Sequence, residues 1–138
     1  MLFLNIDSIR LINFRNYYDI NLELNKNINI FVGKNAQGKT NLLEAIYLCG
    51  QGKSFRTNRD RDLININKNE AYIGAKIKLD GIERLVEIKL EKDRPKRIKI
   101  NKIELKNIKE LHSGLNVVVF SPDDLKLVKE GPAERRNF

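Results

Sequence analysis

One eight-residue motif constrains the possible folds of this chain more than any other feature. Residues 33–40 read GKNAQGKT, which fits the phosphate-binding pattern G-x-x-x-x-G-K-[ST]. In such a loop, backbone N–H groups surround the phosphates, Lys39 adds a positive charge and Thr40 places its hydroxyl on Mg²⁺. The apolar run over 28–32 predicts a strand before the loop, and the helical pattern over 40–49 predicts a helix after it. This setting favours a nucleotide site over a glycine turn that binds nothing.

The motif also indicates which residues hold the expected cofactors, ATP and Mg²⁺. The predicted ATP contacts come from the loop and the residue after it: Gly33, Lys34, Asn35, Ala36, Gln37, Gly38, Lys39, Thr40 and Asn41. Thr40 is the predicted Mg²⁺ ligand. For Asn35, a bond toward the γ-phosphate and a supporting bond within the loop are both open.

A complete hydrolytic site needs a carboxylate at the end of a later strand as well. The apolar run over 117–120 is the candidate strand, but Ser121 and Pro122 separate it from Asp123 and Asp124. Acidic residues directly after a proline are typical of a helix start. We therefore predict no catalytic residue, and the sequence indicates a nucleotide-binding half without a complete hydrolytic site.

Alternating apolar and polar residues predict an antiparallel meander beside the loop. Strands are expected over 3–12, 20–24, 71–79 and 82–90, with a smaller hairpin over 97–105. Asp80-Gly81 is a strong signal for a two-residue hairpin turn, and Asn101-Lys102 marks the second turn. Gly50 and Gly52 are expected to end the helix, and the basic stretch over 53–69 to form a loop with a short helical turn.

Composition narrows the class of protein. A chain of 138 residues predicts one domain. It has no run of about 18 uncharged apolar residues and no signal-peptide pattern, so we expect a cytoplasmic protein without a membrane span. Cys49 is the only cysteine, which fits a reducing compartment, and with His112 as the only histidine no metal site of these ligands is expected. The net charge of +8 fits a nucleic-acid partner or a lysine-rich soluble surface.

Several motifs resemble those of the RecF family in order and spacing. They lie at residues 11–17 (LINFRNY), 33–40, 41–47 (NLLEAIY), 52–56 (GKSFR) and 119–129 (VFSPDDLKLVK), followed by Pro132, Arg135 and Arg136. The resemblance implies an α/β fold, with a P-loop NTPase core of the ABC/SMC type and an antiparallel β-meander.

The family resemblance also implies a function. RecF proteins are SMC-like, ABC-type ATPases of DNA replication, recombination and repair. The resemblance therefore implies that the whole protein forms an ATP-dependent homodimer, binds duplex DNA near single-strand gaps and acts with RecO and RecR in loading recombinase. Family members are more than twice as long, so residues 1–138 are expected to be an incomplete N-terminal ATPase lobe, without the helical subdomain and the strand-end carboxylates. Such a lobe is expected to bind Mg-ATP without hydrolysing it appreciably alone.

The same resemblance implies roles for three residues outside the loop. Arg15 and Asn16 are expected beside the nucleotide, Arg15 on a phosphate and Asn16 on the base or ribose, with a solvated turn as the alternative. Arg56 is expected to contact DNA. Arg59 and Arg61 belong to the same basic run and are further candidates for DNA contact, with an ordinary solvated charge run as the alternative.

Two other functions remain open from the sequence. A complete small P-loop nucleotide kinase would need an acceptor site and a helical lid with arginines. A DNA-binding module with a vestigial P-loop would bind DNA equally with and without ATP.

Overall fold

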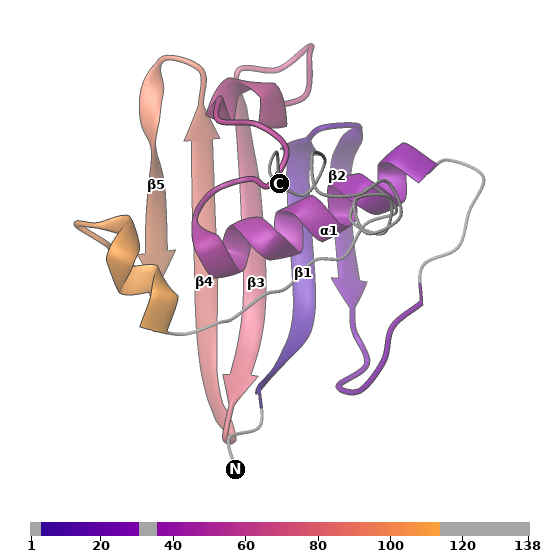
Figure 1. Cartoon of the computed structure of the whole chain (residues 1–138), viewed down its shortest axis with the longest axis vertical. Coiled ribbons are helices and arrows are strands. Elements are labelled where there is room, and N and C mark those ends of the chain that lie inside the picture. Colours follow the sequence, from indigo (N-terminus) through magenta and orange to yellow (C-terminus); the bar gives the residue numbers. More distant parts are fainter. Residues whose placement is uncertain (1–3, 31–35, 114–138) are drawn as a thin grey trace, which may run out of the picture.

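The computed structural model describes residues 4–30 and 36–113, and its main element is one antiparallel sheet (Figure 1). Six strands lie in the order β2-β1-β3-β4-β5-β6. Their bounds are β1 Leu4–Phe14, β2 Tyr17–Glu23, β3 Glu70–Leu79, β4 Ile82–Glu91, β5 Arg94–Ile100 and β6 Ile103–Glu104. The helix α1 (Ala36–Gln51) and the 3₁₀ helices η1 (Asp60–Leu63) and η2 (Ile108–Ser113) complete the described elements. None of these helices is long and apolar enough to cross a membrane.

Helix α1 covers one face of the sheet, lying across β4, β3 and β1 (Figure 1). Because side chains alternate between the two faces of a strand, every second residue of the central strands is buried under the helix. The main core residues of the strands are Ile9, Leu11, Ile73, Ala75, Val86 and Ile88, and those of the helix are Leu42, Ala45, Leu48 and Cys49. Burial raises the pKa of the Cys49 thiol to about 12, so this side chain stays a protonated apolar group.

The predicted hairpins are confirmed. Strands β3 and β4 agree with the predicted ranges to within one residue, and Asp80 (φ 50°) and Gly81 (φ 80°) form the turn between them. Asn101 (φ 51°) and Lys102 (φ 70°) form the turn between β5 and β6. Positive φ at both central residues twists a two-residue turn in the sense that its strands require.

The strand predicted over 28–32 is wrong for residues 28–30. The structure places them outside any strand, and the side chains of Ile28 and Ile30 are 76% and 80% exposed. An apolar run becomes a strand only where neighbours pair with it and pack against it, and no strand of the described residues pairs with residues 28–30. Residues 31–32, the strand predicted over 117–120 and the helix predicted after Pro122 lie outside the described residues.

Helix α1 begins within the motif, at Ala36, rather than at residue 40. Gly50 lies inside the helix, whereas Gly52 ends it with a φ of +74° and an N–H that donates to the Leu48 carbonyl oxygen at 2.8 Å. Glycine is favoured in this position because a side chain strains the left-handed conformation. The 3₁₀ helix η1 matches the short helical turn predicted within 53–69.

Two glycine variants separate backbone strain from crowding. A Cβ on Gly52 would lie 2.8 Å from the side chain of Ile108, whereas a Cβ on Gly81 would meet nothing within 4 Å. Both residues have positive φ. We expect Gly81→Ala to lower the free energy of unfolding by about 1 kcal/mol and Gly52→Ala by roughly 2–3 kcal/mol, because only the latter displaces η2. Urea unfolding measures both values. Equal losses in the two variants would mean that the contact with Ile108 adds nothing to the cost of a side chain at residue 52.

Candidate functional site

The first turns of α1 carry the described part of the motif. Ala36, Gln37, Gly38, Lys39 and Thr40 are helical, whereas Gly33, Lys34 and Asn35 lie outside the described residues. The first N–H groups of a helix have no partner within it, and the helix dipole adds partial positive charge at this end. Together with the ammonium group of Lys39, the helix start is therefore suited to phosphate groups.

Tyr17 attaches this helix start to the sheet. Its hydroxyl donates to the Gly38 carbonyl oxygen at 2.6 Å. Burial raises the pKa of the Tyr17 phenol, so the hydroxyl remains a neutral donor. A Cβ on Gly38 would lie 3.6 Å from the amide nitrogen of Asn16, so the turn between β1 and β2 lies directly against the motif.

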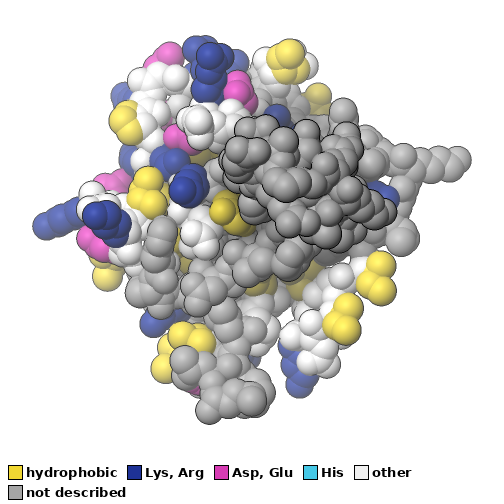
Figure 2. All heavy atoms as spheres, viewed as in Figure 1, with side chains coloured by type: hydrophobic (Ala, Val, Ile, Leu, Met, Phe, Trp, Pro, Cys, Tyr) yellow, Lys and Arg dark blue, Asp and Glu magenta, His cyan; other side chains and the backbone are white. Residues whose placement is uncertain are grey.

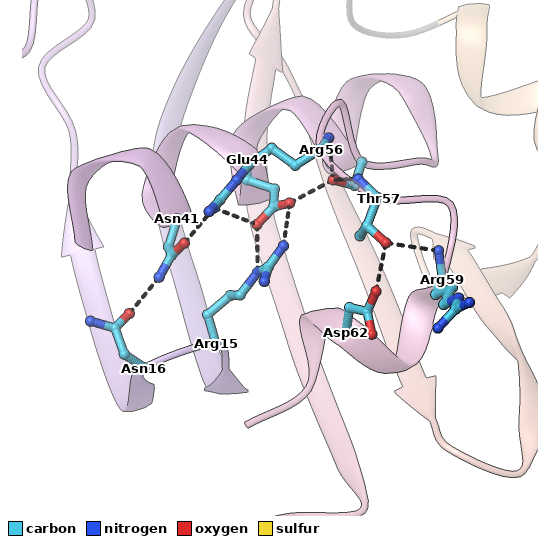
Figure 3. Close-up of polar contacts among 9 residues, drawn as sticks. Arg15, Asn16, Asn41, Glu44, Arg56, Thr57, Arg59 and Asp62 are labelled. Atoms are coloured by element: carbon cyan, nitrogen blue, oxygen red, sulfur yellow. Dashed lines mark hydrogen bonds and ion pairs between the residues drawn. The ribbon is translucent and has the colours of Figure 1, made fainter. Parts of the chain in front are cut away.

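A buried carboxylate follows one turn further along α1. Glu44 is fully buried and accepts both arms of the Arg15 guanidinium, from Nε at 2.9 Å and from Nη2 at 3.0 Å (Figure 3). The Ser54 hydroxyl donates to the same carboxylate, and Arg56 Nη1 lies 3.4 Å from Glu44 Oε1. One carboxylate thus joins the β1–β2 turn, α1 and the loop after α1.

A second line of contacts continues from Arg56 toward the motif. Arg56 Nη1 donates to Asn41 Oδ1 at 2.6 Å, and Asn41 Nδ2 donates to Asn16 Oδ1 at 2.8 Å (Figure 3). The predicted residues Arg15, Asn16 and Asn41 therefore lie in one network with Arg56, although three separate segments supply them.

The loop between α1 and β3 holds the backbone of Arg15. This residue has a φ of 51°, a left-handed conformation that is strained for an arginine, which has neither the freedom of glycine nor the short polar side chain of Asn or Asp. Its N–H donates to the Leu63 carbonyl at 2.8 Å, and its own carbonyl accepts from Asn65 Nδ2 at 2.8 Å. The Asn65 N–H donates to Asn13 at 2.7 Å. These bonds offset the strain and fix the direction in which the Arg15 side chain leaves the turn.

An open pocket of about 540 Å³ lies over this network. Its lining residues are Arg15, Asn16, Tyr18, Asn41, Arg56, Asp62, Ile64, Asn65 and Ile66. The lining combines guanidinium and amide donors with three large side chains, those of Tyr18, Ile64 and Ile66. Such a pocket suits a ligand that has an anionic end and a flat, less polar part.

The three arginines predicted to contact DNA do not form one group. Arg56 belongs to the pocket and its network, whereas Arg59 and Arg61 are exposed and do not line the pocket. The Arg59 N–H donates to Thr57 Oγ1 at 3.0 Å, and the Thr57 hydroxyl donates to Asp62 at 2.7 Å. On the face shown in Figure 2, basic side chains are interspersed with acidic ones.

Sequence reasoning missed four polar residues of the site, Glu44, Ser54, Asp62 and Asn65, and the three large side chains of the pocket, those of Tyr18, Ile64 and Ile66. The helical pattern over 40–49 did not show which face of α1 is buried, and Leu43 is 40% exposed. The buried stripe contains Asn41, Glu44, Ala45 and Leu48, which follow the helical spacing i, i+3, i+4 and i+7. A glutamate on that stripe was the available signal, because a buried carboxylate needs cationic or hydrogen-bonding partners.

Thr40 remains the predicted Mg²⁺ ligand. Among the residues that the structure describes, no group of three or more His, Cys, Asp or Glu side chains is arranged to hold a metal. A P-loop site does not need such a group, because the nucleotide phosphates and water supply most of the oxygen ligands of Mg²⁺.

Comparison with known sequences identifies a family. A family profile described as an AAA domain matches residues 8–128. Relatives named "DNA replication and repair protein RecF" are 54% identical over 133 residues in Alkaliphilus oremlandii and 51% identical over 133 residues in Clostridium botulinum. Each match covers 96% of this chain, which spans 36% of the length of either relative.

Solved structures give the same result. Two structures of the recombination mediator protein RecF, described as RecF-ATPrS and RecF-ATP in the RecFOR pathway, align with TM-scores of 0.86 and 0.84 at 36% and 34% identity. They cover 97% and 99% of this chain, and this chain covers 36% and 38% of theirs. A structure from a study of SMC ATPases aligns with a TM-score of 0.76 at 24% identity over 96% of both chains, a likeness of fold.

These alignments confirm the predicted fold class, an ABC/SMC-type P-loop fold with an antiparallel meander. The chain therefore belongs to the AAA-domain family, and the resemblance to RecF proteins of DNA replication and repair that its motifs predict is confirmed.

Proposed function

We propose that this chain binds Mg-ATP as the nucleotide-binding part of a RecF-type DNA repair ATPase. One observation carries the proposal: Lys39 and Thr40 stand in the first turns of α1, and Arg15, Asn16 and Asn41 meet at the pocket next to them. A helix start with a lysine suits phosphates, and the adjacent pocket suits the rest of a nucleotide.

Each residue has a distinct role in this proposal. The motif backbone and Lys39 bind the β- and γ-phosphates, and Thr40 holds Mg²⁺, which neutralises phosphate charge. The Arg15 guanidinium adds a phosphate contact, and Asn16 bonds to the base or ribose. The base would lie against the apolar lining of the pocket, which includes Ile64 and Ile66.

The remaining functions rest on the relatives. We propose that the whole protein is cytoplasmic, forms an ATP-dependent homodimer, binds duplex DNA near single-strand gaps and acts with RecO and RecR in loading recombinase. Support comes from relatives named for DNA replication and repair and from related structures described as RecF-ATP in the RecFOR pathway. For DNA contact the exposed Arg59 and Arg61 are better placed than Arg56, whose Nη1 is engaged by Asn41.

The test is equilibrium binding of a fluorescent ATP analogue to this chain, with and without Mg²⁺, while ATP turnover is assayed in parallel. We expect saturable, Mg²⁺-dependent binding that ATP displaces better than AMP, because the β- and γ-phosphates carry most of the contacts. We expect no appreciable turnover, because none of the predicted ATP contacts is a carboxylate that could position a water.

Other outcomes would favour the alternatives. Robust phosphoryl transfer to a small acceptor would indicate a complete nucleotide kinase. Duplex DNA binding that ATP leaves unchanged, without any nucleotide binding, would indicate a DNA-binding module with a vestigial loop.

A further inference from the structure

Glu44 is the most deeply buried charged side chain of the site, and none of the predicted contacts with a ligand includes it. It is fully buried in the third turn of α1, on the face that packs against the sheet. Its neighbours on the buried stripe, Ala45 and Leu48, are apolar core residues. The position therefore offers an apolar environment, in which a carboxylate is costly unless it is paired.

Stability is a weak reason for a carboxylate at this position. The free energy needed to remove a carboxylate and a guanidinium from water is about as large as the free energy gained from their attraction. Replacing a buried ion pair with apolar residues is therefore often neutral or stabilising. A buried ion pair that adds little net stability is better explained by the geometry that it imposes. Here it imposes the positions of two arginines.

The Glu44 carboxylate contacts the guanidinium groups of both arginines. Arg15 enters from the β1–β2 turn and meets Glu44 with Nε and Nη2, at 2.9 Å and 3.0 Å. Arg56 enters from the loop after α1, with Nη1 3.4 Å from Glu44 Oε1 and 2.6 Å from Asn41 Oδ1. Both arginines line the pocket, and the negative charge between them reduces their mutual repulsion.

The bonds to Glu44 leave donors for a ligand. A guanidinium has five N–H groups in a fixed fork, and the bidentate contact from Arg15 uses Nε and one hydrogen of Nη2. The same contact fixes the plane of the group, so the other N–H groups point in defined directions. Glu44 and Asp62, which also lines the pocket, balance the charges of the two arginines, so the oriented N–H donors rather than a net charge favour an anionic ligand.

We propose that Glu44 is a positioning residue that holds the guanidinium groups of Arg15 and Arg56 at the pocket for a phosphate-bearing ligand. The inference rests on the proposed function, because ATP supplies that ligand. Glu44 itself makes no contact with the nucleotide and acts through the arginines alone.

The first test is Glu44→Gln, a variant of the same size in which an NH₂ donor replaces one acceptor oxygen, so that the bidentate contact with Arg15 cannot form. NMR of the arginine Nε–H groups reports the geometry directly, because a buried, hydrogen-bonded N–H exchanges slowly with solvent. We expect the protected Arg15 signal of the wild-type chain to be lost in Glu44→Gln and kept in Glu104→Gln, a matched control at an exposed glutamate. Affinity for ATP is expected to fall roughly tenfold in Glu44→Gln only, the size of one charge-assisted hydrogen bond.

A mutant cycle separates positioning from a general structural role. If Glu44 acts only through the two arginines, adding Glu44→Gln to a chain that carries Arg15→Gln and Arg56→Gln should change the ATP affinity by less than about twofold. Independent, additive losses would overturn the inference. If thermal melting shows that Arg15→Gln does not fold, Arg15→Lys replaces it, since lysine keeps the charge but cannot make the bidentate contact.

The outcomes also distinguish this inference from the proposed function. A wild-type chain that does not bind ATP would overturn the proposed function, and the positioning role would then be judged by the NMR signals. A protected Arg15 signal that persists in Glu44→Gln would overturn the positioning role, whether or not ATP binds.

Discussion

Replacing Lys39 with alanine is expected to weaken Mg-ATP binding by on the order of 100-fold, the largest effect on function that we predict. Lys39 lies in the first turns of α1, where its ammonium group and the helix N–H groups would meet the same phosphates. A charge-assisted hydrogen bond to a phosphate contributes up to about 3 kcal/mol, which corresponds to this loss. Titration of a fluorescent ATP analogue in the presence of Mg²⁺ measures the change.

Lys53→Ala is the matched control for this experiment. Lys53 is an exposed lysine just beyond the other end of α1, so its removal changes the net charge equally and should leave ATP affinity within about twofold. Melting temperatures of both variants show whether the fold is kept. Equal ATP affinity in the Lys39→Ala variant and the wild-type chain would mean that the motif does not bind the phosphates, and the proposed site would be wrong.

Local signals account for the parts of the fold that the sequence predicts well. Asp80, Gly81 and Asn101 form turns because the left-handed conformation is open to Asp, Gly and Asn, a property of the residues themselves, whereas Lys102 adopts it as the second residue of its turn. The alternation along β3 and β4 reflects burial of one sheet face under α1. Gly52 ends the helix for a reason that is equally local.

Distant contacts decide the parts that the sequence did not predict. Residues 28–30 begin a mostly apolar segment that resembles a strand in sequence, yet a strand depends on a partner, which local pattern cannot supply. Arg15 and Glu44 are 29 residues apart, and the fold alone brings them together. Asn65 reaches the Arg15 carbonyl across 50 residues.

The same contrast appears within the basic run after α1. Arg56, Arg59 and Arg61 are similar in sequence, with spacings of two or three residues. In the structure the Arg56 guanidinium bonds to Asn41 and lies 3.4 Å from Glu44, whereas Arg59 and Arg61 do not line the pocket, because Arg56 alone of the three lies within reach of the buried carboxylate and amide. Charge patterning predicts a basic segment but not which member joins a site.

Glu44→Ala is expected to have the largest effect on stability, lowering the free energy of unfolding by about 3–5 kcal/mol. The truncation removes a fully buried side chain and takes away the carboxylate that accepts from Arg15 and Ser54. Arg15 is only 22% exposed, so water replaces the lost partner incompletely. For a chain of this size the loss corresponds to a fall of roughly 10 °C in melting temperature.

Calorimetry or thermal melting followed by circular dichroism measures this loss, with the exposed Glu104→Ala as a control that should stay within about 0.5 kcal/mol of the wild-type chain. Glu44→Gln should lie between the two, because the amide fills the same volume and keeps one acceptor oxygen for the Ser54 hydroxyl. A loss below about 1 kcal/mol in Glu44→Ala would mean that the guanidinium groups find other partners, and Glu44 would then not be needed to hold them. If Glu44→Ala loses several kcal/mol of stability while Glu44→Gln remains folded, the two roles of Glu44 can be measured separately. Glu44→Ala then reports the cost of leaving Arg15 without its partner, and Glu44→Gln reports the effect on ATP binding.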